Sequence, residues 1–403
     1  MRELNAPQRK LTGACVIAGT AVVIFLQPLL FLRMLPLHDF LIHLRWADQF
    51  YSALQEGQLL PRWAYASFSG LGDPTFFYYQ PLFYYISSTF LALGIAPNRA
   101  VVLAAAMPYV LTSVIAYQTV LKPHPHKWGL AGALLVVISP SFLFVSTHMG
   151  LLPWTLGVPL SIWFILESLR QRPRIAVLAI LLCLVCLSHL LSALMALCCA
   201  GPSRLILNGL ARRSLGTHIT WGVGLTIGLG LSAFFVYPAV TQLNLINPDG
   251  WTSNRTFDWH ASMMFPTFTY ARFGARWMAF QWFFPVVVLA MALFVVFSPK
   301  TGSGSRNENM AFRYAIASLV AFGLGSELAY PLYTYLSPLQ KLQFPYRFLP
   351  IAAIMSALAF VLHLNEGGWH RATRPMRNIA VLLILSYCAQ AYFVQWSLYR
   401  NGK

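Results

Sequence analysis

Long apolar runs separated by short charged connections dominate the pattern of this chain. A run of about 20 apolar residues predicts an α-helix that crosses a membrane, and shorter runs predict spans that are buried in protein or cross thinned lipid. Eleven spans are predicted in this way, over residues 11–32, 100–121, 129–147, 154–169, 175–188, 190–206, 217–240, 279–298, 314–335, 349–364 and 379–397.

One further apolar run, at residues 76–96, does not fit this series. Counting it as a span would move the basic clusters at 122–127 and 170–174 to the outer side of the membrane, although positive loops belong in the cytoplasm. The run is also rich in aromatic residues and contains Pro81, which suits the membrane interface better than the lipid core. We therefore predict a membrane-surface or re-entrant helix there.

Composition places the chain among polytopic membrane proteins. It is 58% hydrophobic and 10% charged, with a mean hydropathy of +0.61, whereas a soluble domain usually carries about 25% charged residues. No stretch is long and polar enough to fold as a soluble domain, so residues 1–403 are predicted to form a single all-α transmembrane domain. The net charge of +17 is dispersed over loops, and we attribute it to cytoplasmic loops that face anionic lipid rather than to nucleic acid.

The distribution of charge also predicts an orientation. The stretch 1–10 is basic and leads into an apolar run without an obvious cleavage site, so we expect a retained first helix with its amino end in the cytoplasm. With these spans and this orientation, the cytoplasmic loops hold 17 of the 28 basic residues and four of the 11 acidic ones. The other seven carboxylates face the outer side, which has three substantial segments at 33–99, 241–278 and 336–348.

The first outer segment concentrates charge directly after the first apolar run. A helix that starts near Asp39 would place Asp39 and His43 four residues apart on one face, and would lie as an amphipathic helix on the outer surface. Two interpretations of Asp39 stay open, because the carboxylate either caps this helix or acts in catalysis together with His43. The side chains expected to face lipid are Leu37, Phe40, Leu41, Leu44 and Trp46.

Two more ionisable residues are candidates because they lie near the outer ends of predicted spans. Arg347, in the stretch FPYRF, has a fork that matches phosphate geometry, although an arginine there can also snorkel to lipid headgroups. His189 lies at a tight outer turn, where it is either a packed, hydrogen-bonded histidine or a functional group tolerated at membrane depth. Further candidates for substrate binding are His38, Asp73, His148, Arg255, Lys341 and Tyr346.

Several of these stretches, taken in order, resemble a known family. They are His38-Asp39 with His43, GQLLPRW at 57–63, GLGDP at 70–74, YYQPLFYY at 78–85, LSHLLSAL at 187–194 and LQKLQFPYRFLP at 339–350. This series resembles glycosyltransferase C-fold (GT-C) membrane proteins, and most of all the 6-pyruvoyl-tetrahydropterin-synthase-related membrane proteins, which are akin to the YfhO-like group. We infer no pterin chemistry from that inherited name.

The resemblance implies a GT-C-like bundle and a reaction class. Such proteins take a sugar from a polyprenyl-phosphate carrier on the outer side of a bacterial inner membrane and pass it, with inversion, to a lipid, glycan or protein acceptor. By position, Asp39 would be the general base for the acceptor hydroxyl, because a hydroxyl is a poor nucleophile until its proton is taken. Arg347 would contact the phosphate of the leaving carrier.

One segment departs from the family's pattern. Relatives often carry an Arg-Gly pair followed by an acidic residue after the third span, whereas this chain reads STHMGLLPWTLG at 146–157, without a carboxylate. A second acidic position for a metal ion or the donor phosphate is therefore missing. No metal ligand is predicted, and the need for a divalent cation stays open, as do a divergent substrate and a loss of activity.

Three other classes of function also stay open. A lipid or glycan transporter would carry paired charges at mid-membrane and broken helices in related halves, and the sequence shows few intramembrane charges and no paired halves. A membrane acyltransferase or glycan ligase would depend on His189 more than on Asp39. The missing acidic position keeps a catalytically silent partner in polysaccharide assembly among the alternatives.

Overall fold

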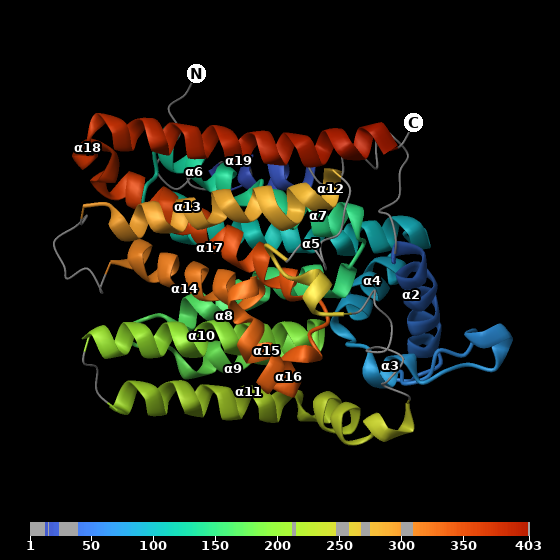
Figure 1. Cartoon of the computed structure of the whole chain (residues 1–403). Coiled ribbons are helices and arrows are strands. Elements are labelled where there is room, and N and C mark those ends of the chain that lie inside the picture. The colour runs from blue at the N-terminus through green and yellow to red at the C-terminus, as the bar shows by residue number, and fades with distance from the viewer. Residues whose placement is uncertain are drawn as a thin grey trace, which may run out of the picture.

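The computed structural model describes residues 13–14, 16–23, 39–211, 215–246, 258–266, 275–299 and 309–401. This part of the chain is helical except for its connections and two isolated bridges, Ala64 with Asp73 and Met264 with Ser326. Most helices run side by side in one bundle, and α2 crosses the bundle at one end (Figure 1). We call this end the α2 end.

The larger helices make up the bundle and its cover. They are α2 (Phe40–Gln55), α4 (Leu82–Ala92), α5 (Pro97–Ala116), α6 (Lys127–Val137), α7 (Pro140–His148), α8 (Leu152–Ser168), α9 (Ile175–Ser188), α10 (Leu190–Ala211), α11 (Leu215–Thr241), α13 (Phe284–Phe297), α14 (Met310–Gly325), α17 (Phe348–His363) and α19 (Arg374–Asn401). The short α-helices are α3 (Thr75–Tyr78), α12 (Ala275–Met278), α15 (Tyr330–Tyr335), α16 (Ser337–Gln340) and α18 (Trp369–Arg371). Short 3-10 and π segments join them: η1 (Phe68–Gly70), η2 (Tyr117–Leu121), η3 (Leu243–Leu245), η6 (His260–Ser262), η7 (Ala279–Phe283), η9 (Glu327–Ala329), η10 (Pro345–Arg347) and η11 (Leu364–Gly368).

Many of these helices have the length and apolarity of membrane spans. A span needs about 20 residues, because each residue adds about 1.5 Å along the helix. Within the described ranges, seven helices meet this requirement, and three apolar helices of 10–17 residues accompany them. The chain is therefore an all-α polytopic membrane protein, as the sequence predicts. The seven are Pro97–Leu121, Lys127–His148, Leu190–Gly209, Leu215–Thr241, Ala279–Phe297, Pro345–Arg371 and Arg374–Ser397.

The span that contains α17 forms the centre of the bundle. Of its most apolar stretch 89% is buried, against 28% for the spans of α11 and α19, which lie at opposite edges of the bundle (Figure 1). α17 packs against α6, α8, α13 and α14, and the Ser318 hydroxyl of α14 donates to the Ala352 carbonyl at 2.8 Å. Because every side chain of α17 is buried, its ends are fixed by protein rather than by lipid.

The prediction of one span over 314–335 is wrong at its carboxyl end. α14 ends at Gly325, and three short helices follow. The cause is tertiary, since the Glu327 N–H donates to the Met264 carbonyl at 3.1 Å and the Met264 N–H donates to the Gly325 carbonyl at 2.9 Å. A Cβ at Gly325 would lie 2.8 Å from the Pro345 carbonyl oxygen, so a larger residue there would push this junction away from η10.

The apolar run at 76–96 does not form a membrane span. It divides at Gln80-Pro81 into α3 and the 11-residue α4. A helix of that length is about 17 Å long, too short for a hydrocarbon core of about 30 Å. α4 packs against α2 and α5, and both α3 and α4 lie beside α2 in Figure 1. This agrees with the predicted surface or re-entrant segment.

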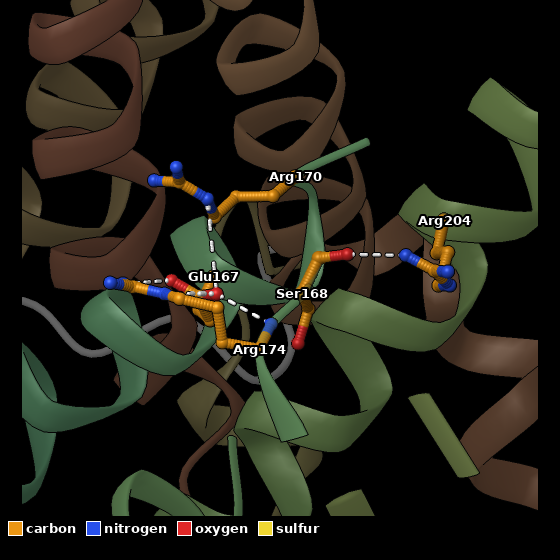
Figure 2. Close-up of polar contacts among 5 residues, drawn as sticks. All are labelled: Glu167, Ser168, Arg170, Arg174 and Arg204. Atoms are coloured by element: carbon orange, nitrogen blue, oxygen red, sulfur yellow. Dashed lines mark hydrogen bonds and ion pairs between the residues drawn. The ribbon is translucent and has the colours of Figure 1, made fainter. Parts of the chain in front are cut away.

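At the opposite end of the bundle, the buried carboxylate of Glu167 organises the turn between α8 and α9 (Figure 2). It accepts hydrogen bonds from the Arg174 backbone N–H at 2.9 Å, Nε at 3.0 Å and Nη2 at 2.7 Å, and Arg170 Nε lies 3.8 Å away. Arg204 Nη1 donates to the Ser168 carbonyl at 2.6 Å. Because Glu167 is 2% exposed, these donors offset a charge that burial would otherwise disfavour.

We expect Glu167→Gln to lower the free energy of unfolding by about 1–2 kcal/mol. The amide keeps one acceptor but loses the charge-assisted bonds to Arg174, whose own exposure to solvent limits the loss. Thermal unfolding of the purified protein in detergent measures the effect. The control is Glu56→Gln, which makes the same change at an exposed position; equal effects in the two variants would contradict the assigned role of Glu167.

Candidate functional site

Ionisable side chains from four separate segments meet at the α2 end. Asp39 precedes α2, Tyr79 lies between α3 and α4, His189 joins α9 to α10, and Arg347 precedes α17. The charge of Arg347 acts on Tyr79 and His189, and the charge of Asp39 acts on Tyr79 and Arg347. The fold thus places Asp39 and His189, which the sequence identified separately, each within electrostatic range of Arg347.

Asp39 occupies the N-cap position of α2, but its side chain does not cap the helix. Its backbone is in the right-handed helical region, and its carboxylate accepts no hydrogen bond from the first turn. The Asp39 backbone N–H instead donates to the Met149 carbonyl at 3.5 Å, and the residue is partly exposed. The capping interpretation is therefore wrong for the side chain, and the catalytic interpretation stays a prediction.

His43 is enclosed by aromatic rings in the buried face of α2. Its Nδ1 makes a hydrogen bond of 2.9 Å with the Tyr84 hydroxyl. Burial lowers the pKa of His43 to about 3, so the ring is neutral at physiological pH. A neutral ring gives Asp39 no positive charge, which makes His43 an anchor of α2 more than a partner in proton transfer. The rings around it, 5.7–6.2 Å away between centroids, belong to Trp46, Tyr79, Phe83 and Tyr84.

The predicted lipid face of this helix is partly wrong. Phe40 is fully buried, and Trp46 is partly buried with its ring centroid 4.9 Å from that of Tyr79. Leu41, in contrast, is 59% exposed, and Leu37 lies outside the described residues. The hydrophobic pattern identified apolar positions, but it contained no information on which of them would meet α4 and α5.

Arg347 is a buried cation at the start of the most enclosed helix. It is 7% exposed, which is incompatible with snorkelling to lipid headgroups. Its Cζ lies 4.8 Å from the centroid of the Phe344 ring and 5.8 Å from that of the Trp154 ring. Its Nε has no hydrogen-bond partner among the described residues. A cation at the positive end of a helix dipole strengthens the local attraction for an anion.

His189 interrupts the chain between α9 and α10 and is almost fully buried. Its backbone is extended, and its Nδ1 accepts a hydrogen bond of 3.2 Å from the Ser192 backbone N–H. Since a backbone N–H can only donate, Nδ1 carries no proton, and the neutral ring is protonated on Nε2. His189 is therefore a packed, hydrogen-bonded turn residue, and its functional role stays a prediction.

Tyr346 and His148 lie behind the charged cluster. The Tyr346 hydroxyl is 3.8 Å from the Met149 sulfur. His148 Nε2 makes a hydrogen bond of 2.8 Å with the Ser397 hydroxyl of α19, and its ring stacks on Phe144 at 4.7 Å. These contacts fix the 148–149 segment, whose Met149 carbonyl receives the Asp39 N–H. The two residues thus support Asp39, and neither is shown to bind a substrate.

Tyr79 belongs to the cluster, although the sequence analysis did not select it. Burial raises the pKa of Tyr79 to about 12, an effect that Arg347 opposes and Asp39 reinforces. The phenol is therefore a proton donor at physiological pH. The sequence did contain one signal for Tyr79, its position directly before the helix break at Gln80-Pro81. The aromatic residues around it, however, are also typical of a segment that lies among lipid headgroups.

Four candidates for substrate binding remain. Asp73 Oδ1 accepts hydrogen bonds from the Thr75 backbone N–H, at 2.8 Å, and from the Thr75 hydroxyl, which makes Asp73 a turn residue. Lys341 is exposed at the end of α16, and His38 and Arg255 lie outside the described residues. Within the described ranges, no group of three or more His, Cys, Asp and Glu side chains could hold a metal ion.

Together these residues make a site suited to an anionic group and to a reacting hydroxyl group beside it. Arg347 provides a buried positive charge, His189 and Tyr79 provide neutral donors, and Asp39 provides a partly exposed carboxylate. A carboxylate near a hydroxyl can accept its proton, and a buried guanidinium favours charge that develops on an oxygen.

Comparison with models of protein families gives a match over most of the chain. A family model described as "6-pyruvoyl-tetrahydropterin synthase related domain; membrane protein" matches residues 76–398. Tyr79, His189 and Arg347 lie within the matched residues, whereas Asp39 and His43 precede them. No curated protein matches the chain.

We expect the stability of the protein to fall as the pH is lowered from 6.5 toward 3, in part because of His43. The pKa of His43 is lower in the folded state than in the unfolded state, so the unfolded state binds the additional proton in this window. One such group contributes a slope of at most about 1.4 kcal/mol per pH unit. Unfolding midpoints of wild type and His43→Gln, measured over this pH range, should converge at low pH; parallel curves would contradict the burial of a neutral ring.

Proposed function

The chain belongs to the 6-pyruvoyl-tetrahydropterin-synthase-related family of membrane proteins, and on that premise we propose that it is a membrane glycosyltransferase. It takes a sugar from a polyprenyl-phosphate carrier and transfers it to a lipid, glycan or protein acceptor. The family description names a membrane protein and no reaction, so the proposal is supported by the residues at the α2 end and by the resemblance of their motifs to GT-C proteins.

In the proposed reaction the acceptor hydroxyl oxygen attacks the anomeric carbon of the sugar. Asp39 accepts the hydroxyl proton, the new C–O bond forms with inversion, and the bond between the anomeric carbon and the carrier phosphate breaks. The electron pair leaves with the phosphate, whose added negative charge Arg347 stabilises. His189 and Tyr79 are additional donors for sugar or phosphate oxygens.

The observation that carries the proposal is the pairing of a partly exposed carboxylate with a buried cation at one end of the bundle. The Asp39 carboxylate does not cap α2, and Arg347 has a buried Nε without a partner among the described residues. Buried polar groups with a purely structural role usually have hydrogen-bond partners within the protein, which Arg347 Nε lacks among the described residues. A partly exposed carboxylate and a buried cation at the starts of two different helices support a role in binding and chemistry.

We further propose that the α2 end faces the outer side of a bacterial inner membrane, with the amino terminus in the cytoplasm. The basic loops support this orientation, because 170–174 belongs to the end of the bundle opposite α2. A polyprenyl-phosphate donor on the outer side would then meet Arg347 at the membrane boundary.

Asp39→Asn should reduce sugar transfer at least about 10²-fold, because an amide cannot accept the acceptor proton. Transfer from a defined polyprenyl-phosphate sugar is measured with purified protein in lipid nanodiscs. Asp48→Asn makes the same change on the exposed face of the same helix and should leave the rate unchanged. Full transfer by Asp39→Asn would rule out the mechanism, and no transfer by wild type with any donor would favour a catalytically silent partner.

Lys341→Cys should react with a membrane-impermeant thiol reagent in intact spheroplasts, whereas Arg172→Cys should react only after the membrane is opened. Both positions are exposed, and they lie in the segments proposed for opposite sides of the membrane. Labelling of the wild type gives the background from the native cysteines. The reverse pattern would invert the proposed orientation.

A further inference from the structure

A second buried donor lies beside Arg347. The Trp154 side chain is 2% exposed, and its indole Nε1 has no hydrogen-bond partner among the described residues. The same holds for Arg347 Nε, and the Arg347 Cζ is 5.8 Å from the centroid of the Trp154 ring. A buried donor without an acceptor destabilises the folded state. Two such donors thus belong to neighbouring side chains.

The contacts within the protein do not use these N–H groups. Arg347 lies over the faces of Trp154 and Phe344, and cation–π contact engages the positive charge without consuming a hydrogen-bond donor. Both rings shield the guanidinium from water, which strengthens its interaction with any anion that reaches it. The arrangement thus concentrates donors and excludes competing water.

Two helix N-termini meet at this point. Trp154 is in the first turn of α8, and Arg347 is the N-cap of α17. Neither first turn contains an acidic residue. The positive ends of both helix dipoles therefore add to the charge of Arg347, and a doubly charged phosphate is better matched to this environment than a neutral hydroxyl.

We propose that the Trp154 indole N–H and the Arg347 guanidinium together bind the phosphate of the lipid carrier. This inference rests on the proposed function, and it adds Trp154 as a residue that positions the phosphate and selects for it. The relevant chemistry is a phosphate monoester or diester oxygen at the membrane boundary, whether it belongs to a polyprenyl carrier or to a phospholipid.

Trp154→Phe tests the role of the N–H group, because it removes the donor and keeps an aromatic ring over Arg347. We expect polyprenyl phosphate to bind about 5- to 30-fold more weakly, in line with the loss of one hydrogen bond to a charged group. Binding of the uncharged polyprenol should not change. Trp154→His, which restores a ring N–H, should recover part of the affinity. Native mass spectrometry of lipid titrations in detergent provides these affinities.

A matched control separates this effect from a general loss of an indole. Trp221 Nε1 donates to the Ser168 hydroxyl at 3.0 Å at the opposite end of the bundle. Trp221→Phe should leave the binding of polyprenyl phosphate unchanged. The unfolding midpoints of all variants identify any that are misfolded. If Trp154→His and Trp154→Phe are both slightly less stable than wild type, comparing their affinities with each other still tests the role of the ring N–H.

The possible outcomes distinguish the inference from the function on which it rests. If Arg347→Gln abolishes the preference for polyprenyl phosphate over polyprenol but Trp154→Phe binds like wild type, the role of Trp154 is wrong and the proposed function stands. If wild type shows no preference for the phosphate, the proposed function itself fails. Equal binding of phosphatidic acid and polyprenyl phosphate, with both weakened in Trp154→Phe, would assign the site to phospholipid phosphate instead.

Discussion

Burial of the Arg347 guanidinium is the constraint on which the α2 end depends. A charge removed from water costs several kcal/mol unless its surroundings stabilise it. Here two aromatic faces and the field of Asp39 provide part of that stabilisation, while the dipoles of α8 and α17 oppose it. Since α17 is the most enclosed helix of the bundle, the cation cannot move toward water. The fold therefore maintains a permanent attraction for negative charge at this point.

The other elements of the α2 end hold the Asp39 carboxylate within electrostatic range of that cation. α2 is anchored by its buried face, through the hydrogen bond of His43 to Tyr84 and the rings around it. Its start is fixed by the bond from the Asp39 N–H to the Met149 carbonyl. Aromatic packing of α2 and a backbone hydrogen bond thus contribute to the position of Asp39.

The buried charges of Glu167 and Arg347, at the two ends of the bundle, have different kinds of partner. At the end opposite α2, the Glu167 carboxylate receives three hydrogen bonds from Arg174, and a carbonyl accepts from Arg204. At the α2 end, buried donors of Trp154 and Arg347 have no acceptor among the described residues. Polar groups that stabilise a fold complete their bonds within the protein, whereas groups that bind a ligand keep bonds available for it. The buried donors of Trp154 and Arg347 are the groups on which the proposed phosphate site depends.

The sequence by itself determined that the protein is a polytopic helical membrane protein, because span length and apolarity are local properties of the chain. It also identified Asp39, His189 and Arg347 as unusual, since charge in an apolar context is visible residue by residue. Only the tertiary structure decided that α14 stops at Gly325, where pairing with Met264 replaces the helix, and that Phe40 faces protein instead of lipid. It also joined Tyr79 and Trp154 to the cluster, because an aromatic residue looks the same in a headgroup belt, a core and a binding site until its neighbours are known.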